Sequence, residues 1–195
     1  MFIKIVQLYY SLIKTNMTRI EKVAEFAKET HKNQVRKYTG RPYFDHLQDV
    51  ADLIKHLENE YQFIVEVAYL HDTLEDQITK VELYKGLHRC EYSREEIEQI
   101  IDYVEELTDE YTIENYPTYN RLLRKSMEAE RLSKISPLAQ TVKYADLFNN
   151  TSSIVELAPD FAKTYLREKE MYLKGMILGD KKLRNKAANV IKKYK

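Results

Sequence analysis

The sequence predicts an all-α fold. Glycine and proline, the residues that interrupt helices, number only four each among 195 residues. Apolar residues recur every three to four positions along most of the chain, as on the buried face of an amphipathic helix, and no stretch alternates with the two-residue period of a strand. Hydrophobic residues make up 44% of the chain, which is enough for a sizeable core. The length indicates one domain with at most a small appendage.

Helix-start signals and apolar periodicity together define the expected helices. A serine or threonine followed three residues later by glutamate forms a capping box, as at Thr18 and Ser93, and a serine followed by proline marks a start at Ser136. Asp45 is the expected cap of another helix, and Pro117 is expected in the first turn of a further one. The expected helical ranges are about 18–35, 45–57, 63–71, 80–87, 93–107, 117–127, 136–147, 159–176 and 183–194.

We expect three parts in the chain: a helical extension in residues 1–16, the main domain in residues 17–178, and a basic C-terminal helix in residues 179–195 that packs on the domain or trails it. The extension is apolar on one helical face, but it is too short to cross a bilayer, and no cleavage site of a signal peptide follows it. Its apolar face predicts packing on the domain or on a second subunit, as in a homo-oligomer, rather than stable membrane association.

The charge balance limits the partners that the chain can have. Lys and Arg together number 31, and so do Asp and Glu, so the net charge is zero. This balance argues against a general nucleic-acid binder, which neutralises many phosphates, but a small phosphorylated substrate needs only a local cationic cluster. Cys90 is the single cysteine. Since one cysteine forms no internal disulfide, we expect a reducing compartment and a cytoplasmic protein.

Residues 71–76, with the sequence His-Asp-Thr-Leu-Glu-Asp, carry the densest chemistry in the chain. They follow an apolar helix whose buried stripe ends at His71, so the adjacent His71 and Asp72 can bind one cation from a single backbone segment. Glu75 and Asp76 follow three and four residues after Asp72, about one helical turn away. Taken alone, a His-Asp pair more often marks a core histidine with a solvated acidic cluster.

Two further candidates lie at helix ends or at the edge of a buried stripe. His46 falls in the first turn of its expected helix, and Asp146 lies beside a buried face, where an unpaired acid is costly. With His71 and Asp72 they form a set of two imidazoles and two carboxylates, which suits manganese, iron or zinc better than magnesium or calcium alone. Such a cation lowers the pKa of bound water and promotes hydrolysis of phosphoesters and phosphoanhydrides. Three of the eight residues in the loop 36–43 are cationic, as a phosphorylated substrate requires.

The pattern of these residues resembles the HD superfamily of metal-dependent phosphohydrolases, and within it the hydrolase domain of the RelA/SpoT family. The resemblance extends from about residue 19 to about residue 178. The segments that carry it are Arg36-Lys37, Gly40, Pro42-Tyr43, His46, Val50-Ala51, His71-Asp72-Thr73-Leu74-Glu75-Asp76 and Val142-Lys143-Tyr144-Ala145-Asp146.

The resemblance implies an all-α HD-domain bundle that removes the 3′-pyrophosphate from guanosine tetra- or pentaphosphate. It implies a manganese ion, with iron, zinc or another divalent metal as alternatives, held by His46, His71, Asp72 and Asp146. Glu75 and Asp76 match the pair that positions or deprotonates the attacking water. The residues that match the family's substrate contacts are Arg36, Lys37, Asn150 and Ser153.

Two positions depart from the family pattern on the substrate side. Leu147 stands where the family usually has a basic residue, and Ser152 where it usually has an arginine. Two alternatives therefore stay open. The chain could act as a phosphohydrolase on another nucleotide, such as a nucleoside monophosphate or an NADPH-like dinucleotide, or as a nucleotide sensor without turnover.

Overall fold

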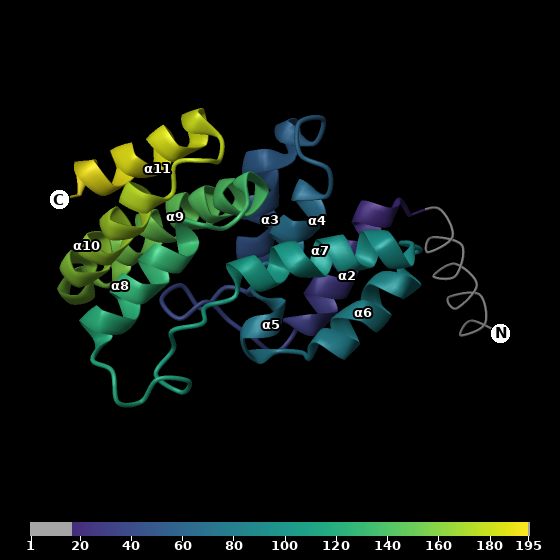
Figure 1. The fold of residues 1–195 in the computed structure, drawn as a ribbon, viewed down its shortest axis with the longest axis horizontal. Helices are drawn as coiled ribbons and strands as arrows, with labels where there is room; N and C mark the ends of the chain where they lie inside the picture. Colours follow the sequence, from purple (N-terminus) through teal and green to yellow (C-terminus); the bar gives the residue numbers. More distant parts are fainter. Residues whose placement is uncertain (1–16, 195) are drawn as a thin grey trace.

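The computed structural model describes residues 17–194, and of Asp76 the backbone alone. Within this range the chain forms helices and turns without any strand, apart from one isolated bridge between Val35 and Pro42, so the all-α prediction is confirmed. The helices, shown in Figure 1, are α2 (Arg19–Thr30), α3 (Phe44–Ile54), α4 (Ile64–Leu70), α5 (Thr73–Asp76), α6 (Lys80–Arg89), α7 (Arg94–Leu107), α8 (Arg121–Leu132), α9 (Pro137–Leu157), α10 (Pro159–Gly175) and α11 (Lys181–Lys193), with a 3₁₀ turn at Lys55–Leu57.

Helix α9 runs through the middle of the bundle. It contacts α3, α4 and α7 on one side and α10 and α11 on the other, as Figure 1 shows. Residues 138–147 of α9 are all buried, and so is every residue of the seven-residue helix α4. Because α3, α4 and α9 contact one another, polar residues on their facing surfaces meet inside the molecule.

The predicted capping signals begin helices at the expected residues. Thr18 and Ser93 each accept a hydrogen bond from the backbone N–H three residues ahead, and the glutamate at that position bonds back, which completes a capping box. Ser136 caps α9, with Pro137 in the first helical position. Thr79 forms a third capping box at the start of α6, and this helix ends at Arg89 rather than at residue 87.

Several expected helix ends were wrong. The chain enters α3 through Tyr43, which is already in the helical conformation, and Asp45 instead forms an ion pair with Arg41 at 2.9 Å. Helix α8 begins at Arg121 rather than near Pro117, because Asn120 supplies the cap and accepts from Leu123 N–H. Helix α9 continues to Leu157, past its expected end at residue 147.

Helix α2 ends at Thr30, five residues earlier than its apolar periodicity indicated. His31 is buried and its ring bonds Gln34 at 2.6 Å, so both residues belong to a turn. The chain then doubles back between Val35 and Pro42 through Gly40, whose φ of 67° favours glycine. This tight loop presents Arg36 to α9.

Of the three parts expected in the chain, the structure describes the main domain and the C-terminal helix. Helix α11 packs against α9 and α10, while the boundaries at residues 17 and 179 stay predictions. The extension in residues 1–16, and with it the expected subunit contact, lies outside the described residues. No helix between residues 17 and 194 is long and apolar enough to cross a membrane.

Candidate active site

The four predicted metal ligands converge from three separate segments of the chain. His46 lies in the first turn of α3, His71 and Asp72 join α4 to α5, and Asp146 lies midway along α9. The His46 Nε2 atom is 3.4 Å from Asp146 Oδ1 and 3.7 Å from Asp72 Oδ2. The His71 Nε2 atom is 3.1 Å from Asp72 Oδ2 and 4.0 Å from Asp146 Oδ1. Donors bound to one cation at about 2.1 Å have such mutual separations.

The two imidazoles are oriented for ligation. Nδ1 of His71 lies 2.8 Å from the Ala68 carbonyl oxygen, and Nδ1 of His46 lies 2.8 Å from the Asn149 side-chain oxygen. Each Nδ1 therefore carries a proton, and Nε2, which faces the carboxylates, is the nitrogen available to a metal. Both Nε2 atoms are buried without a hydrogen-bond partner in the described structure. Since an unpaired buried nitrogen is costly, the donor set fits a divalent cation.

The site holds its carboxylates in the anionic form. Burial opposes the charge on Asp146, but Lys143, whose Nζ is 3.2 Å from Asp146 Oδ2, keeps the pKa of Asp146 well below its usual range. Burial also opposes the charge on Asp72, and His71 lowers the pKa of Asp72. Two anionic carboxylates match the charge of a divalent ion, which imidazoles bind in their neutral form.

Asp72 has a further partner that sequence reasoning did not assign to the site. The Tyr43 hydroxyl donates to Asp72 Oδ2 at 2.6 Å, and the Tyr43 ring stacks on His31 with centroids 5.1 Å apart. Such outer contacts fix the direction of a ligating carboxylate. The available signal was the Pro42-Tyr43 pair within the family-like pattern, four and three residues before His46.

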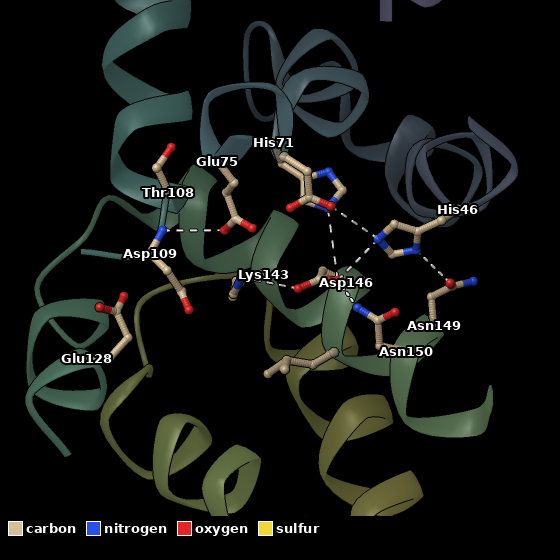
Figure 2. Close-up of polar contacts among 12 residues, drawn as sticks. His46, His71, Glu75, Thr108, Asp109, Glu128, Lys143, Asp146, Asn149 and Asn150 are labelled. Atoms are coloured by element: carbon tan, nitrogen blue, oxygen red, sulfur yellow. Dashed lines mark hydrogen bonds and ion pairs between the residues drawn. The ribbon is translucent and has the colours of Figure 1, made fainter. Parts of the chain in front are cut away.

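Glu75 lies on the next helical turn, in α5, and remains accessible to solvent. Its Oε1 accepts a hydrogen bond from the Asp109 backbone N–H at 3.4 Å, as Figure 2 shows. Although part of the Glu75 side chain is exposed, the protein atoms packed around its carboxylate displace water from it. This desolvation, together with the charge of Asp72, raises the pKa of Glu75 to about 7. A carboxylate with that pKa can accept a proton near neutral pH. Asp76 ends α5, and its side chain lies outside the described structure.

Arg36 gathers three side chains of α9. Its guanidinium donates to the side-chain oxygens of Asn149 and Asn150, both at 2.8 Å, and to Ser153 Oγ at 3.1 Å. Asn150 in turn donates to Asp146 Oδ1. The structure thus joins the predicted substrate contacts Arg36, Asn150 and Ser153 directly to the metal-ligand cluster.

The other substrate-side positions lie differently. Lys37 is exposed, and its Nζ is 5.5 Å from the centre of the Tyr38 ring, so the structure does not bring it to the cluster. Leu147 is buried in the core, and the Ser152 hydroxyl bonds the Phe148 carbonyl of its own helix at 3.5 Å. Neither departure supplies a cation to the site.

Lys143, Asn149 and Asp109 are further residues of the site that sequence reasoning missed. Lys143 precedes Asp146 by three positions, a spacing at which helical side chains pair, so a signal for this contact existed. Asn149 bonds both His46 and Arg36, yet its neighbour Asn150 was the residue named from the sequence. No local signal linked Asp109 with Glu75, because 34 residues separate them.

Comparison with known proteins agrees with the fold and with the family resemblance. No family model matches the chain. Over 142 residues, which are 70% of this chain and 70% of the relative, the sequence is 33% identical to the human guanosine-3′,5′-bis(diphosphate) 3′-pyrophosphohydrolase MESH1. A solved structure of a metazoan SpoT orthologue, described as hydrolysing ppGpp with a role in starvation responses, superposes with a TM-score of 0.72 at 18% identity. That match covers 91% of this chain and 96% of the other.

The helical bundle, its His/Asp cluster and the 33% identity to MESH1 together show an HD-superfamily hydrolase. Within that superfamily the chain belongs to the SpoT-like family that includes human MESH1. The resemblance stated from the sequence motifs is confirmed.

Proposed function

We propose that this chain hydrolyses guanosine tetra- and pentaphosphate at the 3′ position and releases pyrophosphate. The observation that carries the proposal is the convergence of four donors from three segments, with two buried imidazole nitrogens left without a partner. The relationship to MESH1, a 3′-pyrophosphohydrolase of guanosine-3′,5′-bis(diphosphate), supports the choice of substrate.

Manganese is the metal that we propose for the site, with iron or zinc as alternatives. His46, His71, Asp72 and Asp146 would hold it, because mixed imidazole and carboxylate donors suit these ions. A divalent ion bound there supplies positive charge that lowers the pKa of water and stabilises negative charge on a phosphoryl group.

The remaining roles follow from the positions of the side chains. Glu75 takes a proton from the attacking water, since the pKa of Glu75 is raised to about 7 and its side chain is accessible. We assign Asp76 to the same task on its match to the family motif alone.

Arg36 is the donor that we propose for a substrate phosphate. Its planar guanidinium is held by Asn149 and Asn150, so the direction of its N–H groups is set before substrate arrives. Asn150 and Ser153 would contact the substrate beside it, and Lys37 would need to turn in from the surface.

The cellular setting stays at the level of prediction. The single cysteine, Cys90, is buried and free, which is consistent with the reducing cytoplasm. The partner that we propose is a small nucleotide rather than a nucleic acid, in line with the zero net charge.

A second candidate is the same chemistry on another phosphorylated nucleotide, including an NADPH-like dinucleotide or a nucleoside monophosphate. It is favoured by the substrate side of α9, where Leu147 is buried and Ser152 is neutral. The family usually has a cationic side chain at each of these two positions. Without them the site is less selective for a heavily charged substrate.

The deciding experiment uses the purified chain. The protein is stripped of metal, reloaded with manganese and offered guanosine tetraphosphate, and the products are resolved by anion exchange. We expect guanosine diphosphate and pyrophosphate, with turnover lost on chelation. Absence of turnover while manganese is bound would contradict this substrate; a panel of other nucleotides then separates the second candidate from a sensor that binds without turnover.

A further inference from the structure

The segment that follows α7 runs directly beside Glu75. Its second residue, Asp109, donates its backbone N–H to Glu75 Oε1 at 3.4 Å. The Asp109 carboxylate accepts from Lys125 Nζ of α8 at 2.9 Å. Asp109 therefore lies between the proposed base and α8, as Figure 2 shows, and is held from both sides.

A buried ion pair in α8 anchors the backbone on either side of Asp109. Glu128 is completely buried, and its Oε2 accepts the N–H groups of Glu110 and Tyr111 at 3.2 and 3.1 Å. Its Oε1 accepts from Arg131 Nε at 2.9 Å.

Arg131 completes this network on the other side of Asp109. It donates to the carbonyl oxygens of Glu106 and Thr108 at 2.8 and 3.1 Å. Together the Glu128–Arg131 pair binds one carbonyl near the end of α7 and one carbonyl and two amides of the following loop.

A buried ion pair such as Glu128–Arg131 costs free energy that its contribution to stability alone does not explain. Removing two charges from water takes several kcal/mol per ion, so a buried pair often contributes no more stability than apolar side chains of the same size. Apart from the bonds that join Glu128 to Arg131, the hydrogen bonds of this pair go to the backbone of residues 106–111. The pair is therefore suited to specifying the position of that backbone.

Glu75 has a reason to need this support. It lies on α5, a helix of only four residues, which is too short to be stable without outside contacts. The charged groups that face it are Asp72 from its own segment, Asp109 from the loop and Lys143 from α9. Two of the three are acids that repel a carboxylate, so an N–H donor and the Lys143 ammonium must hold it.

We propose that Asp109 is a positioning residue for Glu75, and that the Glu128–Arg131 pair, through the backbone of residues 106–111, fixes where Asp109 donates its N–H. The inference rests on the proposed function, because it assigns a support to the base of that reaction. Glu128 and Arg131 touch neither the metal-ligand cluster nor substrate-side residues; they act through the loop.

The test replaces Glu128 by glutamine, which keeps the size of the side chain and removes its charge. We expect kcat for guanosine tetraphosphate to fall about five- to tenfold, with manganese affinity unchanged. The N–H donor favours the ionised form of Glu75, so its loss raises the pKa of Glu75, and the acid limb of the pH–kcat profile should move to higher pH. Amide hydrogens of residues 109–111 should exchange faster.

Two controls separate positioning from general destabilisation. Glu66→Gln changes another buried carboxylate, which accepts from the Tyr92 hydroxyl at 2.7 Å outside this network, and should leave the pH profile unmoved. In a Glu75→Gln background, Glu128→Gln should cause no further loss of kcat, because it acts through Glu75. If Glu128→Gln fails to fold, Lys125→Met, which frees the Asp109 carboxylate, should shift the profile in the same direction.

The outcomes are distinct. A wild-type protein that binds manganese but does not turn over guanosine tetraphosphate contradicts the proposed function itself. Wild-type turnover combined with an unshifted pH profile in Glu128→Gln, or with an additive loss in the double variant, overturns the positioning role and leaves the proposed function intact.

Discussion

Asp72 contributes an anionic oxygen that faces both imidazoles and the Tyr43 hydroxyl. We expect Asp72→Asn to abolish manganese binding and turnover together, because an amide is a far weaker ligand than a carboxylate. Metal content after dialysis and pyrophosphate release measure the two effects. Asp52→Asn, an exposed acid on α3, is the matched control and should change neither. Retained metal in Asp72→Asn would rule out Asp72 as a ligand.

Glu75 forms no ion pair with His46 or His71 among the described residues, so its loss should separate chemistry from metal binding. We expect Glu75→Gln to keep manganese and to lower kcat about a hundredfold or more, as losing a general base does. Single-turnover kinetics on the metal-loaded variant measure the step. A fully active variant would show that another group takes the proton.

How far the site could be predicted from sequence differs from residue to residue. The convergence of His46, His71, Asp72 and Asp146 was predictable because their spacing matches a family motif, and the structure brings the four side chains together; their role as metal ligands stays a prediction. Asp109 was not found, because its contact with Glu75 depends on how the loop after α7 closes, and no local pattern encodes that path.

Among the elements, α9 shows what helical periodicity does and does not predict. Lys143, Asp146 and Asn150 follow one another at three and four positions, so one face carries the lysine, the ligand and the substrate-side amide. The start of α9 was predictable from Ser136 and Pro137, since capping is a local property. The start of α8 also has a local cap, Asn120, but Pro117 offered a competing start, and the stacking of Tyr116 on Tyr119 in the loop between them could not be read from a local pattern.

The packing of α9 against the turn before α11 leaves no room for a side chain at Gly179. A methyl group added there would lie 2.8 Å from Thr141 Oγ1 and from the Tyr144 ring, and 2.9 Å from the Thr141 backbone nitrogen. We expect Gly179→Ala to lower the free energy of unfolding by about 1–3 kcal/mol, since the backbone of a central helix cannot move aside. Urea denaturation measures the loss. Asn185→Ala on the exposed face of α11 should stay within about 0.5 kcal/mol of the parent.

At the scale of the whole molecule, composition and periodicity were sufficient for the all-α fold, while the meeting of α3, α4 and α9 was not deducible from them. That meeting depends on which apolar faces pack together, and it was available only through the resemblance to a known family. Because the proposed ligands come from residues 46, 71–72 and 146, the site exists only when the whole bundle is folded. Metal binding and global stability are therefore linked.

The link between metal binding and stability depends on pH. Burial lowers the pKa of His71, but the charges of Asp72 and Asp146 outweigh it and raise the pKa of His71 to about 9 in the metal-free protein. In the unfolded chain the pKa of a histidine is about 6.5. The protonated imidazole therefore stabilises the metal-free fold fully below about pH 6.5, and this contribution is lost as the pH rises through about 9. A cation must displace that proton, so its own stabilising effect should grow over the same range.

We expect manganese at a hundredfold excess over its dissociation constant to stabilise the fold by about 2.7 kcal/mol and to raise Tm by about 5–10 °C. The increase in Tm should be larger at pH 8.5 than at pH 6.5, at equal free manganese. Thermal melts of chelated and loaded protein at the two pH values measure it. His56→Gln, an exposed histidine outside the cluster, should behave as the parent does. An equal increase at both pH values would mean that no protonated histidine is displaced, and His71 would then lose its assignment as a ligand.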